Sequence, residues 1–219
     1  MSQYPLKLSV QSEIVPVVSI LVSVGLSIYF YFHFGDTITT HWNFQGEPDG
    51  YSGKAVGAFG IPALMIGMYI LLLVMPLLDP KRDRYHDFEK VYHMFKAGFV
   101  FFFLCMVAAT GFFNLGYNVP INYIIPFLVG LLLMLIGNFM GKIKNNWFMG
   151  IRTPWTLANE NVWNKTHQLA GRLFIWMAAI SLLGIFSEKY ALLFSIAPIV
   201  IVSVWLMVYS YLEFRKEGK

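Results

Sequence analysis

The sequence contains little charge and almost no cysteine. Only 13% of its 219 residues are Asp, Glu, Lys or Arg, against about 25% in an ordinary soluble domain. The single cysteine, Cys105, excludes an internal disulfide and a thiolate metal cluster. A soluble chain of this size still exposes about a third of its surface to water after folding. So few charges therefore argue against a soluble enzyme and against a nucleic-acid-binding domain.

Apolar residues dominate instead. They make up 57% of the chain, and the mean hydropathy is +0.59. Six runs of about 20 mostly apolar residues are each long enough to cross a bilayer as a helix. These runs are 14–34, 55–78, 97–117, 121–140, 169–187 and 190–212. The sequence therefore predicts an all-α, polytopic membrane protein, built as a bundle of about six transmembrane helices.

Lysine and arginine are distributed unevenly between the connections of these runs. One side carries 14 of them, and the other carries two, Lys54 and Lys189. The basic side comprises 1–13, 79–96, 141–172 and 213–219. Because cytoplasmic loops of membrane proteins carry the excess of Lys and Arg, we expect both termini in the cytoplasm, the loop 35–54 outside and the segment 141–168 inside.

Small residues recur at four-residue spacing on two of the runs. Ser19, Ser23 and Ser27 share one face of the first run, and Gly137 and Gly141 lie at the end of the fourth. Such stripes let helices approach closely. We expect these residues to pack against neighbouring helices rather than to bind a ligand.

The outer loop reads GDTITTHWNFQGEPDGYSGK and is dense in turn-forming Gly and Pro. Because these residues restrict or permit particular backbone angles, we expect a structured loop that holds its side chains in place. The candidates for ligand or partner binding in this loop are His41, Asn43, Gly46 and Asp49.

A cation site in the same loop is a weaker alternative. His41, Glu47 and Asp49 could supply nitrogen and oxygen ligands, helped by Asp36, but their spacing matches no zinc signature, so no metal is assigned. In the other interpretation the loop is a capped turn. His41 and Asp49 would then bond to backbone groups of the loop itself.

The inner segment reads GKIKNNWFMGIRTPWTLANENVWNKTHQLAGRLF. Asn, Gly and Pro predict a loop in its first half. In its second half Asn159 can cap a helix and Glu160 complements the helix start. We therefore expect an interfacial amphipathic helix before the fifth span. The candidates for ligand or partner binding are Asn146, Gly150, Arg152, Thr153, Pro154, Trp155, Thr156, Trp163 and His167.

Arg152 and His167 have the widest chemical scope in this segment. A guanidinium grips carboxylate or phosphate in a fork, and imidazole titrates near neutrality. The sequence contains no HExxH, no Ser-His-Asp order, no P-loop and no Gly-rich dinucleotide turn, so we expect neither enzyme activity nor a cofactor. Two interpretations stay open. Either these residues bind a protein, or Arg152 binds lipid phosphate and His167 is a satisfied interfacial side chain.

Two stretches resemble the SdpI family, membrane immunity proteins against the SDP killing factor of Gram-positive bacteria. HWNFQGEPDGYSGK resembles the small uncharacterised domain commonly found at the N-terminal end of family members, and NWFMGIRTPWTLANENVWNKTHQLAGRLF resembles the family's second signature. The resemblance covers nearly the whole chain. Its matching positions in the second stretch are Gly150, Ile151, Arg152, Thr153, Pro154, Trp155, Thr156, Leu157, Trp163, Thr166, His167 and Gly171.

The resemblance implies a bacterial cell-membrane protein that protects the cell from a secreted peptide toxin. It also implies signalling, in which the toxin-bound protein holds a small DNA-binding autorepressor at the inner face. The expected partners are the bilayer, the toxin and such a repressor, with no direct binding of nucleic acid. We expect two units, a two-span unit at 1–96 containing loop 35–54, and an SdpI-like four-span unit at 97–219 containing the cytoplasmic segment 142–172.

Two other functions stay open. One is a small transporter or exporter, with Asn114, Asn138 and the intramembrane prolines shaping a path for a peptide or lipid-like compound. None of the spans has an acidic residue at its centre, which such pumps usually need. The other is a membrane-embedded, metal-dependent hydrolase that uses the polar residues of the outer loop or of the inner segment.

Overall fold

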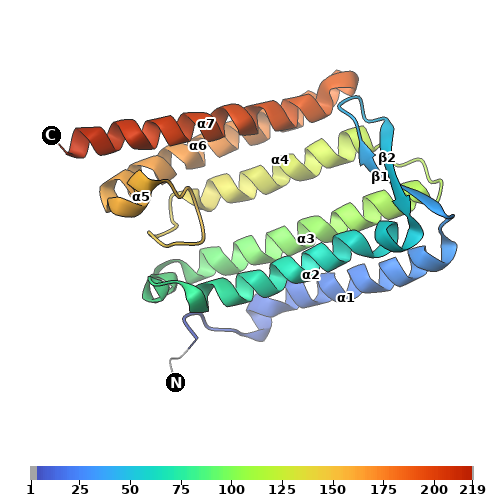
Figure 1. Ribbon diagram of the computed structural model, residues 1–219, viewed down its shortest axis with the longest axis horizontal. Helices are drawn as coiled ribbons and strands as arrows, with labels where there is room; N and C mark the ends of the chain where they lie inside the picture. Colours follow the sequence, from blue (N-terminus) through green and yellow to red (C-terminus); the bar gives the residue numbers. More distant parts are fainter. Residues whose placement is uncertain (1–3, 219) are drawn as a thin grey trace.

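The computed structural model describes residues 4–218, without the side chains of residues 188 and 189. Long helices account for most of this range (Figure 1). The helices are α1 (Val10–His33), α2 (Lys54–Leu78), α3 (Glu89–Asn114), α4 (Ile121–Met140), α5 (Pro154–Ala158), α6 (Glu160–Gly184) and α7 (Ala191–Glu217). Two 3-10 helices, η1 (Arg82–Phe88) and η2 (Ile185–Tyr190), precede α3 and α7.

Six of the described helices are long and apolar enough to cross a membrane. These are α1, α2, α3, α4, α6 and α7. They run roughly parallel to the long axis of the molecule (Figure 1). The prediction of an all-α, polytopic membrane bundle is therefore confirmed. The third span begins earlier than the predicted 97–117, because α3 already starts at Glu89 and places Lys96 inside the bundle.

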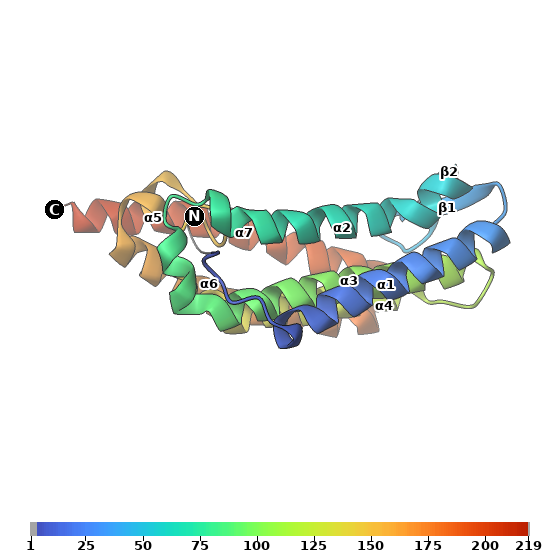
Figure 2. The same ribbon diagram turned by 90° about the horizontal axis from the view of Figure 1, so that it is seen from below.

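The helices pack in two groups of three. α1, α2 and α3 pack together, as do α4, α6 and α7, and contacts between α3 and α4 join the groups (Figures 1 and 2). The largest buried cluster draws on both groups, since it contains Tyr85, Tyr92, Met140, Trp163 and Leu206. The division into units at 1–96 and 97–219 stays a prediction.

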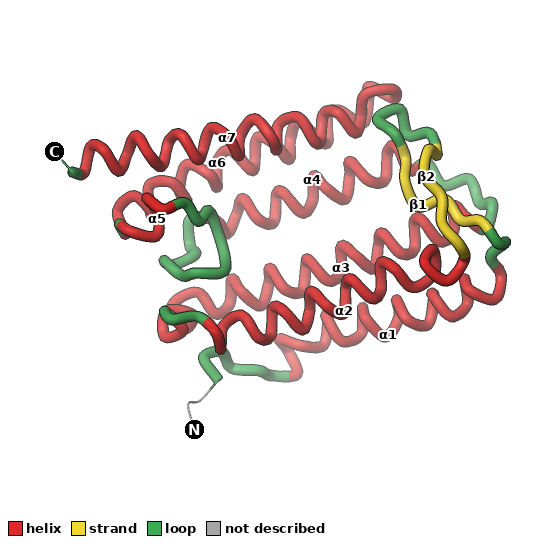
Figure 3. Tube along the Cα trace, viewed as in Figure 1, coloured by secondary structure: helices red, strands yellow, loops and turns green. Residues whose placement is uncertain are grey.

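The two ends of the bundle carry different structures. Both termini, η1 and α5 lie at one end, here called the terminal end, and the two strands lie at the other, here called the hairpin end (Figure 3). Both termini therefore face the same side of a membrane that the six helices cross.

Residues 35–54 form a structured loop, as predicted, but they also contain strands that the sequence analysis does not predict. β1 (Thr37–Trp42) and β2 (Pro48–Gly53) pair antiparallel, with Thr37 opposite Gly53. The register shifts after Thr39, where β1 bulges. Three threonines and an isoleucine favour extended backbone in β1, and this strand signal could have revealed the hairpin.

The amphipathic segment before the fifth span is helical, as predicted, but it is not a separate helix. α6 runs without interruption from Glu160 to Gly184, and only the short α5 precedes it. Asn159 caps α6 by accepting hydrogen bonds from the amides of Asn161 and Val162. Gly171 lies within this helix and packs directly against α4.

The small-residue stripes pack between helices, as predicted. Ser19, Ser23 and Ser27 are buried on α1. A Cβ atom added to Gly137 of α4 would lie 2.9 Å from the carbonyl oxygen of Gly171 on α6. Glycine is therefore required for the two backbones to lie this close.

Candidate functional site

Residues 142–158 form a folded loop at the terminal end, and buried asparagines shape it. The Asn146 side chain is fully buried. Its Oδ1 accepts from the amides of Phe148 (2.9 Å) and Met149 (2.6 Å), and its Nδ2 donates to the carbonyls of Lys144 and Met149. Asn146 therefore bonds mainly to the backbone of its own loop and fixes the turn that leads to Gly150.

His167 of α6 supports the loop at Ile151. Its ring is almost fully buried and stacks on Trp163, with 3.9 Å between ring centroids. The amide of Ile151 donates to Nε2 (3.0 Å), so the proton lies on Nδ1, which donates to the carbonyl of Trp163 (2.8 Å). The accepting Nε2 requires a neutral ring. His167 is a structural support in this geometry.

Gly150 is required beside this histidine. Its φ is +108°, and a Cβ atom there would lie 2.4 Å from Nε2 of His167. Trp163 completes the support by donating from Nε1 to the carbonyl of Ile143 (2.8 Å). Gly150, Trp163 and His167 are all candidates predicted from the sequence, and the structure brings them together.

Thr153 and Thr156 form a capping box at the start of α5. Thr153 accepts from the amide of Thr156, and Thr156 accepts from the amide of Thr153 (2.9 Å). Thr153 also shares a hydrogen bond with Ser210 of α7 (3.0 Å). Pro154 occupies the first turn of α5, where its missing N–H costs nothing. α5 is thus tied to α7.

Arg152, Trp147 and Trp155 face outward from this folded loop. Arg152 is exposed, and its Nη1 donates to the carbonyl of Trp147 (3.0 Å). The Trp147 side chain is also exposed, and Trp155 is partly buried against Tyr211 of α7. Arg152 uses one of its five N–H donors in this bond. The surface of Arg152, Trp147 and Trp155 is here called the inner surface.

A carboxylate from the first half of the chain holds the same loop, which the sequence analysis does not predict. Asp79, at the end of α2, is almost fully buried. Its Oδ2 accepts from the amide of Trp147 (2.9 Å) and from the hydroxyl of Tyr85 (3.0 Å). Lys81 donates to the side chain of Asn145. The position of Asp79 directly after a transmembrane run is the only sequence signal for this role.

At the hairpin end, the polar residues of the outer loop bond in pairs. His41 Nδ1 lies 2.5 Å from Asp49 Oδ1 across the hairpin. Asn43 Oδ1 accepts from the amides of Gln45 and Glu47, and its Nδ2 donates to the Glu47 carboxylate. His41 and Asp49 therefore bond to each other rather than to the loop backbone, and Asn43 shapes the turn.

The hairpin is anchored to the helix ends. Asn114 of α3 accepts from the amide of Thr39 (2.8 Å) and donates to its carbonyl (3.0 Å). Ile38 is buried against helix side chains. Gly46, with φ of +79°, lies at the turn, where a Cβ would meet the side chain of Asn122 on α4. Gly46 thus allows the turn to rest on α4.

The structure does not bring the weak metal candidates together. Within residues 4–218, no group of three His, Cys, Asp or Glu side chains could hold a metal ion. Glu47 bonds to Asn43 while His41 bonds to Asp49. The cation site considered on the sequence therefore finds no support in the arrangement of this loop.

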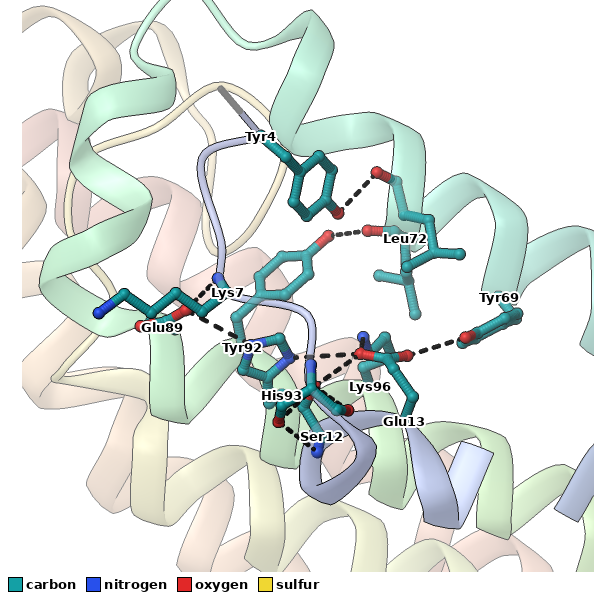
Figure 4. A network of polar contacts seen from close by, with 12 residues as sticks. Tyr4, Lys7, Ser12, Glu13, Tyr69, Leu72, Glu89, Tyr92, His93 and Lys96 are labelled. Carbon is teal, nitrogen blue, oxygen red and sulfur yellow. Dashed lines mark hydrogen bonds and ion pairs between the residues drawn. The ribbon is translucent and has the colours of Figure 1, made fainter. Parts of the chain in front are cut away.

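A second polar site lies inside the first group of helices, and the sequence analysis misses it (Figure 4). Lys96 of α3 is fully buried and lies 2.5 Å from the Glu13 carboxylate of α1. Tyr69 of α2 donates to the same carboxylate (2.8 Å). Charged side chains inside a membrane protein are costly and commonly functional. A lysine directly before a predicted span is a signal that could have found this site.

His93 completes this charge cluster. Its Nδ1 lies 3.9 Å from Glu13 and its Nε2 lies 3.7 Å from Glu89, and neither ring nitrogen has a hydrogen-bond partner among the described residues. Glu89 also accepts from the backbone amide of Lys7 (Figure 4). The cluster therefore joins α1 to α3 and fixes the segment before α1.

Tyr4 closes this segment over the cluster. Its hydroxyl donates to the carbonyl of Leu73 on α2 (2.9 Å). Burial, and secondarily the negative charge of Glu13, raise the pKa of Tyr4 to about 12. Tyr4 therefore remains a neutral hydrogen-bond donor at physiological pH.

Comparison with known proteins finds relatives of both ends of the chain. Residues 142–210 match the SdpI/YfhL protein family, and residues 18–66 match a domain of unknown function (DUF1648). The chain is 25% identical over 207 residues to the immunity protein SdpI of Bacillus subtilis (strain 168). The aligned region covers 94% of this chain and 97% of that protein. No solved structure matches the chain. The resemblance to the SdpI family is confirmed.

Proposed function

We propose that this relative of SdpI is a non-enzymatic membrane immunity protein, which protects the cell carrying it from a secreted peptide toxin. The observation that carries the proposal is the similarity to an immunity protein along 94% of the chain. It includes the folded loop 142–158 and the hairpin, so both candidate surfaces lie within the similar region.

The distribution of basic residues supports one orientation. The segments that connect or flank the six spans carry 14 Lys and Arg residues at the terminal end and two at the hairpin end. Under the positive-inside rule the terminal end lies in the cytoplasm of a bacterial cell and the hairpin lies outside. The toxin would then approach the hairpin, and a cytoplasmic partner would approach the inner surface.

The hairpin offers a contact surface of suitable chemistry. Phe44, Tyr51 and the His41–Asp49 pair are exposed on it, while Ile38 beneath them is buried. Exposed aromatic residues on a fixed backbone supply large contact area at a low entropy cost. This outer surface, with Asn43 and Gly46 shaping its turn, is the proposed toxin contact.

The inner surface is the proposed contact for a cytoplasmic autorepressor. Arg152 and Trp147 are exposed, and Arg and Trp are among the side chains enriched in binding hot spots. The buried residues His167, Gly150 and Asn146 support this surface from beneath. Signalling requires toxin to bind one arrangement of the bundle more tightly than another.

Protection can be tested directly in a toxin-sensitive strain that lacks its own immunity gene. Expression of the full chain should raise survival in the presence of purified SDP killing factor. The double substitution Phe44→Ala/Tyr51→Ala should reduce survival, while Phe32→Ala, an exposed residue of α1, should not. Membrane fractionation checks that each variant is inserted. An inserted wild-type chain that gives no protection contradicts the proposal.

Signalling needs a separate readout, because protection and signalling could reside at different ends. Arg152→Ala/Trp155→Ala should abolish toxin-dependent recruitment of the repressor to the membrane while preserving survival. Lys144→Ala, an exposed lysine of the same loop, is the matched control. Unchanged recruitment in the double variant would remove the proposed role of the inner surface.

Transport is a second candidate function, and the charge cluster favours it. Lys96 and Glu13 are paired within the first group of helices, and intramembrane charges mark ion pathways in many transporters. Flux of the SDP killing factor across liposomes containing the purified chain, absent with Lys96→Met, would support transport over passive protection.

A further inference from the structure

A shallow groove runs between α4 and α6 near the terminal end. It has a volume of about 380 Å³ and belongs to neither surface proposed above. Its lining residues are Gly137, Asn138, Gly141, Lys142, Gln168, Gly171, Arg172 and Ile175. Gly137 and Gly171 let the two helix backbones approach closely, and Gly141 leaves room beside them.

Two cations line this groove without an acidic partner. Lys142 and Arg172 are both exposed, and neither forms an ion pair with any acidic residue whose side chain the structure describes. Some other cations at the same end are paired, since Arg84 pairs with Glu160 and Lys165 pairs with Glu213, but Lys142 and Arg172 are unpaired and line the same groove. The groove is therefore a local concentration of uncompensated positive charge.

The groove lies at the depth of the lipid phosphates. α4 has 20 residues, which at 1.5 Å each span about 30 Å, the thickness of the hydrocarbon core. Lys142 follows the end of α4 by two residues, and Gly171, beside Arg172, contacts Gly137 in the last turn of α4. Both cations are thus at the boundary between hydrocarbon and headgroups.

Apolar side chains continue from the groove toward the membrane centre. Ile175 lines the groove, and Trp176, one turn along α6 from Arg172, is exposed. An occupant that matches this surface needs a negatively charged head at Arg172 and an apolar tail along the helix. Gln168 and Asn138 add amide groups that can bond to headgroup oxygens.

We propose that this groove binds the phosphate headgroup of one anionic phospholipid from the leaflet at the terminal end. Lys142 and Arg172 hold the phosphodiester, and the acyl chains follow Ile175 and Trp176. Basic pockets between transmembrane helices recognise acidic headgroups by this same combination of charge and shape. The site is independent of the proposed immunity function.

The test uses the full chain, purified and delipidated in a neutral detergent, with lipid binding followed by native mass spectrometry. Phosphatidylglycerol should bind more tightly than phosphatidylcholine of the same chain length. Lys142→Gln/Arg172→Gln should weaken phosphatidylglycerol binding by about ten- to thirtyfold, because each cation near a headgroup contributes on the order of a five-fold gain in affinity. Equal affinity for the two lipids would overturn the proposal.

Two further variants separate this groove from general surface charge. Lys90→Gln/Lys144→Gln removes two other exposed lysines at the same end and should change binding less than twofold. Gly141→Leu keeps both cations but fills the groove. A Cβ at position 141 makes only ordinary contacts, the nearest at 3.7 Å, so this variant should fold and still lose the lipid. Binding retained in Gly141→Leu would overturn the groove as the site.

A soluble phosphate compound could offer the same phosphate group to Lys142 and Arg172. A competition experiment distinguishes it from a lipid. Glycerol 1-phosphate at millimolar concentration carries the head without the tail and should not displace phosphatidylglycerol. Displacement by glycerol 1-phosphate would assign the groove to a soluble anion and overturn the lipid assignment.

Discussion

Single residues at the terminal end act chiefly through the backbone. Asn146, His167 and Asp79 are buried, and each bonds to main-chain amides of the loop 142–158. A buried amide left without its acceptor costs about 1–3 kcal/mol. These side chains therefore fix the loop, and exposed residues such as Arg152 are left for binding.

Substitution of Gly150 should unfold this loop. In Gly150→Ala the new Cβ meets His167 Nε2, and the positive φ alone costs about 1–3 kcal/mol. Thermal unfolding in detergent measures the loss. Gly116→Ala, where φ is positive but nothing lies near the new Cβ, should show the backbone cost alone. Gly25→Ala, inside α1 with open space and no positive φ, should lose no stability. Equal stability of the Gly150 and Gly116 variants would contradict the contact with His167.

The pair of Lys96 and Glu13 should respond to substitution as a unit. Lys96→Met leaves the Glu13 carboxylate without its cation, which costs about 3–5 kcal/mol for a buried pair. Adding Glu13→Gln should recover more than half of that loss, because no unpaired charge is left. Denaturant unfolding of both single variants and the double variant gives the coupling. Additive losses would show that the two side chains act independently.

Among the elements, the β-hairpin depends on α3 for its position. Asn114 makes two hydrogen bonds to Thr39 and one to Thr110 within its own helix. The Asn114 side chain thus ties β1 to the end of a transmembrane helix.

Asn114→Ala should loosen the hairpin without unfolding the bundle. Loss of two bonds of about 0.5–1.5 kcal/mol each should raise hydrogen exchange at Thr39 by roughly ten- to a hundredfold. Asn138→Ala is the matched control, since within residues 4–218 Asn138 bonds only to Met134 of its own helix. Unaltered exchange in β1 would place the anchor elsewhere.

The sequence predicts the spans well and the polar contacts between them poorly. Hydropathy identifies six helices because each span must be apolar over its whole length. The hairpin and the unbroken α6 depend on pairing and packing with distant residues, such as Gly137 against Gly171. The contact between Asp79 and Trp147 joins positions 68 residues apart, and periodicity carries no information about such partners.

For the whole molecule, the arrangement in the membrane can be tested by labelling. In a Cys105→Ala background, Gln45→Cys should react with an impermeant thiol reagent added to intact cells, and Arg152→Cys should react only after the membrane is opened. Both positions are exposed in the structure, so access decides the result. Tyr51→Cys and Lys90→Cys repeat the comparison at other exposed positions. Labelling of position 152 but not 45 would invert the orientation.

The bond between Asp79 and Trp147 also restricts how such proteins can recombine. A hybrid joined at residue 96 would take the carboxylate from one parent and the loop that it supports from the other. A fusion between two distant relatives should therefore be stable only when the residue at position 79 and the loop 142–158 fit each other as they do within one parent. The two sequence blocks are therefore expected to be inherited together rather than exchanged as independent modules.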